Sequence, residues 1–254
     1  MSRAGWIRLI VIAAAVAALE LACRLGLIDR FTVIPPSEMA MALAEVATSP
    51  GLVAEIAASL ANIAIAVMSA TVAGVAVGIA LHRLQRIRRI VDPLLSSYYA
   101  LPLFAFYPFF IVLFGVGAVP IVIMGFLAGL AVMVLATLDG LDAIPRVLLK
   151  VAKMHQLGAV ATALRVQLPA AAPHVLSGVK LAIAYGFIGV IASEFILSGH
   201  GLGFAVGYAY NSFDTRTMYG LILFIVLMVI ALNLVLHAWD RRLRLRRSRL
   251  AGPP

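Results

Sequence analysis

The chain has 254 residues, of which 63% are hydrophobic and 12% are charged, and its mean hydropathy is +1.07. Soluble domains are roughly 45–50% apolar and about 25% charged, so the composition excludes an ordinary soluble domain and predicts an integral membrane protein. The net charge of +9 raises the question of nucleic-acid binding, which the distribution of the charges argues against.

Six apolar segments are long enough to cross a bilayer, since about 20 helical residues span its hydrocarbon core. We therefore predict an all-α membrane protein with six transmembrane helices and a cytoplasmic loop between spans four and five. The expected spans are approximately 7–28, 56–81, 93–114, 118–138, 172–197 and 217–239. The expected parts are an N-terminal transmembrane helix (1–30), an external amphipathic segment (31–55), a five-helix core (56–240) containing the loop 139–172, and a basic tail (241–254).

The basic residues predict the topology of these spans. If the N-terminus is cytosolic, 17 of the 20 lysines and arginines fall on the inside, Lys180 and the six arginines between 241 and 249 among them. Arg24, Arg30 and Arg216 are the other three. By the positive-inside rule both termini are cytoplasmic, and the tail is expected to contact anionic lipid headgroups rather than nucleic acid.

The segment after the first span begins with Ile34-Pro35-Pro36, which stops a helix, and Ser37 is a candidate cap for a new one. Met39, Leu43 and Val46 then share a face, so residues 37–48 are expected to form a short amphipathic helix on the outer surface.

The second span carries small residues at four-residue intervals: Ala66, Ala70, Gly74 and Gly78. Such spacing lets helix backbones approach closely in lipid. The row is consistent with a pore or dimer interface, but packing inside the bundle is the favoured interpretation.

The third span is rich in aromatic residues and contains Pro102 and Pro108. Proline frees backbone carbonyls, which is tolerated in a membrane where a neighbour or a cavity restores the hydrogen bonds. Tyr98, Tyr99 and Tyr107 are candidates for a pore lining together with Pro102, whereas the phenylalanines are equally consistent with a lipid-facing surface.

The polar stretch from Asp142 to Lys180 is long for a loop between membrane helices and has room for two helices, with a break at Leu168-Pro169. Val147, Val151, Met154 and Leu157 follow helical spacing on one face. A partly apolar, partly cationic helix outside the bilayer predicts a surface that docks against another protein.

The fifth span ends with Glu194, an acidic residue near the outer boundary, where such residues are paired or functional. A structural role, in which the carboxylate accepts hydrogen bonds from backbone amides of the following segment, is favoured over a role in conduction. That segment is rich in glycine and aromatic residues, so Gly201, Gly203 and Phe204 join Glu194 as candidates for an outer gate over the pore. An ordinary solvated loop is the alternative.

Signatures of catalysis are missing from the sequence. It contains no Walker A motif, its five histidines are scattered, and Cys23 has no partner for an internal disulfide. We therefore expect a protein that is not an enzyme and holds no metal or cofactor of its own.

Several short motifs, in order and at their spacings, carry a family resemblance from about residue 35 to the C-terminus. They are IPPSE (34–38), ALP (100–102), FGVG (114–117), ATLDGL (136–141), QLPAAAP (167–173), SEF (193–195), GLGF (201–204) and SFDT (212–215). On these motifs the chain resembles the permeases of ATP-binding-cassette (ABC) importers of the nitrate/sulfonate/taurine branch, and its long polar loop resembles their "EAA" loop.

The resemblance implies a type I importer permease whose loop sits in a groove of a separate ATPase. Counting back from Leu168-Pro169, the family's EAA positions fall on Lys150, Val151 and Ala152, and its glycine on Gln156, so this chain departs from the pattern. Gly158 is an alternative place for the break. Docking is expected to use Val151, Met154 and Leu157, ringed by the basic Lys150, Lys153 and Arg165.

The resemblance also implies the partners: two ATPase subunits that bind ATP and Mg²⁺, a periplasmic substrate-binding protein and a second copy of the chain, all at the bacterial inner membrane. The branch carries small anions such as sulfonates and nitrate, and some relatives carry neutral heterocycles. A secondary transporter without an ATPase is the runner-up, although the two halves of the chain do not match as its inverted repeats would require. A noncatalytic membrane scaffold is the third possibility.

Overall fold

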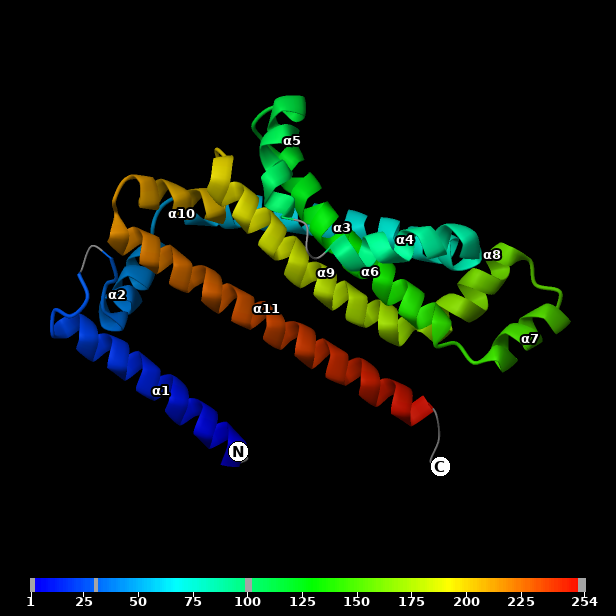
Figure 1. Ribbon diagram of the computed structural model, residues 1–254. Helices are drawn as coiled ribbons and strands as arrows, with labels where there is room; N and C mark the ends of the chain where they lie inside the picture. The colour runs from blue at the N-terminus through cyan, green and yellow to red at the C-terminus, as the bar shows by residue number, and fades with distance from the viewer. Residues whose placement is uncertain (1–2, 30–31, 99–101, 251–254) are drawn as a thin grey trace. The chain divides into compact units, whose positions relative to one another are not determined.

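The computed structural model describes residues 3–29, 32–98 and 102–250, and all regular structure within these ranges is helical (Figure 1). The helices are α1 (Arg3–Arg24), α2 (Pro36–Ala47), α3 (Leu52–Arg83), α4 (Gln85–Ser97), α5 (Tyr107–Phe114), α6 (Ala118–Asp142), α7 (Arg146–Met154), α8 (Ala159–Thr162), α9 (Leu168–Leu197), α10 (Leu202–Asn211) and α11 (Thr215–Leu250). A 3₁₀ turn, η2 (Leu103–Phe106), precedes α5, and a π-helical turn, η3 (Ala163–Gln167), joins α8 to α9.

Five helical segments among the described residues are long and apolar enough to cross a membrane: Gly5–Arg24, Leu52–Arg83, Ala118–Asp142, Val160–Ile196 and Thr215–Ala238. They correspond to the first, second, fourth, fifth and sixth predicted spans. The all-α membrane fold expected from the sequence is therefore confirmed, and the predicted basic tail begins as a continuation of α11.

The predicted third span, 93–114, is wrong as a single helix. Residues up to Ser97 belong to the amphipathic helix α4, and the apolar helical part that follows covers only Leu103–Phe114. The reason is backbone chemistry: Pro102 lacks an amide proton and stands at the N-cap of η2, while Gly115, with φ of +78°, ends α5. Tyr99 lies outside the described residues.

The chain divides into two compact units, each described by itself: the core unit (residues 57–203) and the flanking unit (residues 1–56 and 204–254). In the core unit α3, α6 and α9 pack through small residues. A side chain added at Gly125 of α6 would lie 2.9 Å from the Cβ of Ala66, and one added at Gly189 of α9 would lie 2.9 Å from the Cα of Gly125.

The small-residue row of α3 is therefore an internal packing surface, as favoured from the sequence. Gly74 and Gly78 continue it toward the C-terminal end of α3, where added side chains would meet Met133 at 2.5 Å and Thr137 at 2.7 Å. Such contacts bring helix backbones close enough for van der Waals attraction to hold them in lipid.

In the flanking unit, α2 packs on α11, where a side chain at Gly220 would meet the backbone of Ala42 at 2.9 Å. Helix α2 matches the predicted helix 37–48 within one residue, but its N-cap is Pro35. The expected cap, Ser37, instead donates its hydroxyl (2.7 Å) and its amide (3.0 Å) to the carboxylate of Glu20 on α1.

Candidate functional sites: an exposed loop helix and a buried carboxylate

The loop between the fourth and fifth predicted spans forms the short helix α7. Three residues, Ala143 to Pro145, separate it from α6, and Pro145 holds its φ at −58° before the first turn. The helix ends in two capping bonds: the Gln156 amide donates to the Lys153 carbonyl (2.9 Å), and the Leu157 amide donates to the Ala152 carbonyl (3.1 Å). This pair is a Schellman motif, which requires a left-handed residue after the helix.

The left-handed residue is Gln156, with φ of +53°. It occupies the position at which the resemblance places the family's glycine, so the reversal falls there and not at Gly158. The predicted break at Leu168-Pro169 is wrong, because α8, η3 and α9 follow one another without interruption. Pro169 fits in the first turn of α9, where a helix needs no amide proton.

The outer side of α7 is apolar and exposed. Val147 is 68% exposed, Val151 44% and Met154 81%, whereas Ala152 is buried against the chain. Leu157 is half-buried, and its backbone amide makes the second capping bond of α7. Lys150, Lys153 and Arg165 are exposed, which gives the apolar surface a basic surround.

Glu194 is completely buried near the end of α9 and accepts hydrogen bonds from three groups of the core unit. The Ser59 hydroxyl donates at 2.6 Å, the Gly203 amide at 3.1 Å and the Asn62 side-chain amide at 3.3 Å. All three groups are donors here, which suits an ionised carboxylate in a dry setting. Ser59 also accepts the amide of Leu202 at 2.8 Å, so the carboxylate and α3 together hold the start of α10.

Two glycines make this arrangement possible. Gly201 has φ of +110°, and a side chain there would lie 2.3 Å from the Glu194 carboxyl carbon. At Gly203 an added side chain would lie 2.2 Å from the carbonyl oxygen of Ile191. Glu194, Gly201 and Gly203, named as one group from the sequence, thus lie in contact.

The tyrosines proposed for a pore lining lie in different surroundings. Tyr107 is completely buried and interacts electrostatically with Glu194, so it does not face an open pathway in the described chain. Tyr98 donates its hydroxyl to the Leu127 carbonyl at 2.6 Å. Tyr98 and Pro102 line a cavity of about 280 Å³ with Leu103, Phe104, Ala128, Tyr185 and Ile188.

Phe204, the last gate candidate, belongs to the flanking unit. Most of the glycine-rich segment forms helix α10 and not the solvated loop given as the alternative, and within it Phe204 contacts Tyr208 with ring centroids 6.0 Å apart. Both rings line a cavity of about 430 Å³, whose acidic members are Glu45, Glu55 and Asp214.

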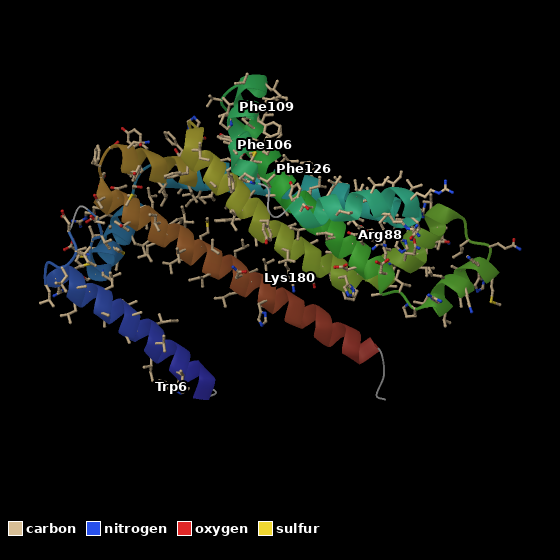
Figure 2. All side chains as sticks on the ribbon, viewed as in Figure 1. Trp6, Arg88, Phe106, Phe109, Phe126 and Lys180 are labelled. Carbon is tan, nitrogen blue, oxygen red and sulfur yellow. The ribbon has the colours of Figure 1, made fainter. Side chains whose placement is uncertain are left out.

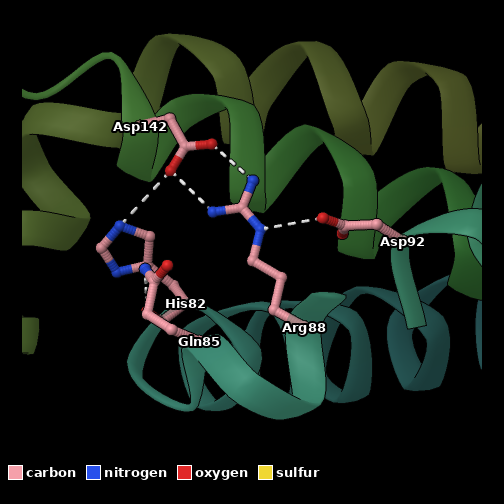
Figure 3. Close-up of polar contacts among 5 residues, drawn as sticks. All are labelled: His82, Gln85, Arg88, Asp92 and Asp142. Atoms are coloured by element: carbon pink, nitrogen blue, oxygen red, sulfur yellow. Dashed lines mark hydrogen bonds and ion pairs between the residues drawn. The ribbon is translucent and has the colours of Figure 1, made fainter. Parts of the chain in front are cut away.

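A polar cluster where the end of α3, the start of α4 and the end of α6 meet was not predicted. The Arg88 guanidinium donates two hydrogen bonds to Asp142, at 2.8 and 2.6 Å, and lies 3.5 Å from Asp92 (Figure 3). The His82 Nε2 lies 3.5 Å from the same Asp142 carboxylate. The hydrogen bonds and charge of Asp142 raise the pKa of Arg88 above its ordinary value. The spacing of Arg88 and Asp92 was the only signal in the sequence, because Asp142 is 54 residues away.

Lys180, counted among the cytosolic basic residues, lies on helix α9 within the long apolar segment Val160–Ile196 (Figure 2), and its side of the membrane stays a prediction. Cations inside membrane segments are costly and mark functional or paired positions.

The comparisons with known proteins agree with this architecture. The profile of the family described as "Binding-protein-dependent transport system inner membrane component" matches residues 70–249. The taurine transport system permease protein of Escherichia coli is 29% identical over 224 residues, covering 86% of this chain and 82% of the relative. A nitrate import permease protein of Leptolyngbya laminosa is 28% identical over 186 residues, covering 73% and 67%.

A probable ABC transporter permease protein of Brucella melitensis is 31% identical over 196 residues, covering 76% of this chain and 78% of the relative. Among the described residues, no three His, Cys, Asp or Glu side chains form a group suited to a metal ion. The family match spans well over half of the chain, and the chain therefore belongs to the family of binding-protein-dependent transport system inner membrane components, as an ABC importer permease.

Proposed function

We propose that two copies of this chain form the solute pathway of an ATP-driven importer, which receives its solute from a periplasmic binding protein. ATP and Mg²⁺ are bound and hydrolysed by two partner ATPase subunits, one docked on each copy. A single chain with one docking helix supplies half of such a pathway, and a closed two-fold pair is the economical assembly.

The exposed apolar surface of α7 carries this proposal. Val147, Val151 and Met154 project beyond the membrane segments without cover in the described chain, although side chains of this kind are normally buried. An apolar centre with a basic rim suits an acidic-edged groove on a partner, because the centre supplies affinity and the rim supplies orientation.

The orientation that we propose follows from the same helix. If α7 meets a cytoplasmic ATPase, then α6 ends and α9 begins at the inner membrane surface, and both termini are cytoplasmic. The positive-inside count of basic residues supports this orientation with or without Lys180, which lies on α9.

The solute that we propose is a small anion. The relatives are described as a taurine transport permease and a nitrate import permease, and both of those solutes carry an anionic group. The cavity of Tyr98, Phe104 and Tyr185, about 280 Å³ in volume, supplies room for a small solute of this kind. Thermal-shift screening of the cognate binding protein with taurine, nitrate, alkyl sulfonates and neutral heterocycles tests the class; stabilisation by the heterocycles alone would contradict it.

The docking experiment replaces one exposed residue of α7 with aspartate. Met154→Asp places a charge in an apolar socket, at a cost of several kcal/mol, and we expect the ATPase to be lost from the purified complex while the permease still inserts. Leu84→Asp is the matched control, since Leu84 is 52% exposed but lies between α3 and α4, outside α7 and the membrane-length segments. Retention of the ATPase and of transport by Met154→Asp would show that α7 is not the docking element.

A further inference from the structure

Helix α4 carries, near its two ends, one residue bound to the end of α6 and one that lines the aromatic cavity. One end of α4 carries Arg88, which binds Asp142 at the last residue of α6. The other end is capped by Tyr98, which lines the cavity of about 280 Å³. Tyr98 follows Arg88 by ten positions, which corresponds to about 15 Å at the helical rise.

The connection between α7 and Asp142 is short and stiff. Only Ala143, Ile144 and Pro145 intervene, and Ile144 is buried in an apolar cluster with Leu141 and Ala171. The amide of Ala143 donates to the Asp139 carbonyl at 3.0 Å, which continues the helical bonding of α6 by one residue. A movement of α7 therefore displaces the end of α6 rather than being absorbed by a flexible linker.

The contact between Arg88 and Asp142 is suited to transmit such a movement. It is bidentate, with two nearly parallel hydrogen bonds, so it fixes the direction of the guanidinium as well as its distance. The Arg88 side chain is 19% exposed and that of Asp142 45%, so the geometry of the pair, more than burial, fixes the contact, and Asp92 lies 3.5 Å from the guanidinium on its Nε side (Figure 3).

We propose that Arg88 and Asp142 are positioning residues of the transport cycle: they transmit the displacement of α7 to α4, and α4 moves Tyr98 and with it the wall of the cavity. His82, near the end of α3, supports the pair, because its Nε2 lies 3.5 Å from the same Asp142 carboxylate. The proposal rests on the proposed function, because it requires an ATPase docked on α7.

The test uses the complete complex, with permease, ATPases and binding protein in lipid nanodiscs or proteoliposomes. The variants Arg88→Gln and Asp142→Asn are expected to keep ATPase co-purification and ATP hydrolysis, while solute transported per ATP falls about tenfold, a typical allosteric coupling. Arg89→Gln is the matched control, because Arg89 is an exposed neighbour on the same helix. The exchanged pair Arg88→Glu with Asp142→Arg is expected to regain most of the coupling.

A second readout distinguishes transmission from a general loss of stability. A spin label at Leu94→Cys on α4, a position 66% exposed and away from the docking surface, in a chain with Cys23→Ala, is expected to gain mobility in the Arg88→Gln permease and not in Arg89→Gln. Arg88→Lys keeps the charge without the bidentate geometry, so it serves as a second variant if Arg88→Gln fails to insert. The amount of solute that it transports per ATP is expected to lie between those of the unchanged complex and Arg88→Gln.

The two proposals fail in different ways. If Arg88→Gln and Asp142→Asn, with ATPase bound, transport as much solute per ATP as the unchanged complex, the transmission through α4 is refuted and the docking role of α7 stands. The transmission through α4 is also refuted if Arg88→Lys transports as much solute per ATP as the unchanged complex and the spin-label mobility is unchanged in Arg88→Gln. If no ATPase co-purifies with the unchanged permease, the proposed function itself fails.

Discussion

The backbone amide of Gly203 donates a hydrogen bond of 3.1 Å to the carboxylate of Glu194, nine residues earlier in the chain. The turn between α9 and α10 is thereby closed on a buried charge, which Ser59 and Asn62 of α3 also hold. A charged acceptor makes each of these bonds stronger than a neutral pair would be. The start of α10 is fixed to the core unit by side-chain chemistry rather than by apolar packing alone.

Removal of this carboxylate is expected to loosen the outer end of α9. Glu194→Ala leaves the donors of Ser59, Asn62 and Gly203 without their acceptor, and we expect a loss of at least about 2 kcal/mol in stability. Glu194→Gln keeps one acceptor oxygen, and its stability is expected to lie between those of the unchanged permease and Glu194→Ala. Thermal unfolding of the purified permease measures the stability of both variants.

The same variant tests the outer-gate hypothesis. If Glu194 holds a gate closed, the Glu194→Ala complex in nanodiscs hydrolyses ATP faster in the absence of the binding protein, and the binding protein stimulates it less. Basal hydrolysis and stimulation at the levels of the unchanged complex would show that Glu194 is a structural group only.

Gly201 and Gly203 are expected to tolerate no side chain. Gly201→Ala forces a left-handed residue and a contact of 2.3 Å with the Glu194 carboxyl group, and Gly203→Ala places a methyl group 2.2 Å from a backbone oxygen. Each is expected to lower the yield of folded permease and its unfolding temperature. Gly199→Ala is the control, with nothing within 4 Å of the added carbon; equal stability of all three variants would contradict the described turn.

Gln156→Gly is expected to strengthen the end of α7. A left-handed conformation costs a residue with a side chain about 1–2 kcal/mol, and glycine avoids most of this cost. Hydrogen exchange of peptides covering 146–157 is therefore expected to slow. Gly158→Ala, which meets open space, should leave exchange nearly unchanged. Faster exchange in Gln156→Gly would place the helix end elsewhere.

Asp214 begins α11 by accepting the Thr217 amide at 3.0 Å, and hydrogen bonds from the Thr217 side chain and amide lower the pKa of the Asp214 carboxyl group below its ordinary value. Because the folded pKa is the lower one, the contribution to stability is complete above the pKa of the unfolded chain and is lost as pH falls through the folded pKa. Asp214→Ala is expected to cost about 1 kcal/mol near neutral pH.

The control for Asp214 is asparagine, which caps a helix without titrating. Thermal unfolding between pH 3 and pH 7 should show that Asp214→Asn removes this residue's part of the acid sensitivity while keeping most of the stability. An acid response identical to that of the unchanged chain would exclude Asp214 as a contributor.

The sequence predicted those parts of the fold that depend on long apolar runs. Four of the five membrane-length segments are single helices with nearly uninterrupted stretches of apolar residues. The other segment, Val160–Ile196, runs through the π-helical turn η3 into α9. The third predicted span failed because average hydrophobicity does not show where backbone hydrogen bonding stops. Pro102 interrupts a stretch whose composition alone suits a membrane helix, and Gly115 ends it.

The same distinction applies to the sites. The pairing of Glu194 with the glycine-rich turn is local in sequence, and glycines beside a carboxylate suggested it. Arg88 and Asp142 are 54 residues apart, and Ser59 and Glu194 are 135 apart, so only the packing of α3, α4, α6 and α9 brings them together. The left-handed Gln156 was hidden because its side chain gives no sign of that conformation.

The most direct test of the account is solute uptake by the reconstituted complex. Proteoliposomes would hold the permease and its ATPase with MgATP on the ATPase side, and the binding protein with radiolabelled taurine or nitrate on the other. We predict uptake against a gradient that requires ATP, the ATPase and the binding protein together, and that Met154→Asp abolishes it. Uptake by the permease alone, driven by an ion gradient and indifferent to ATP, would identify a secondary transporter and contradict the account.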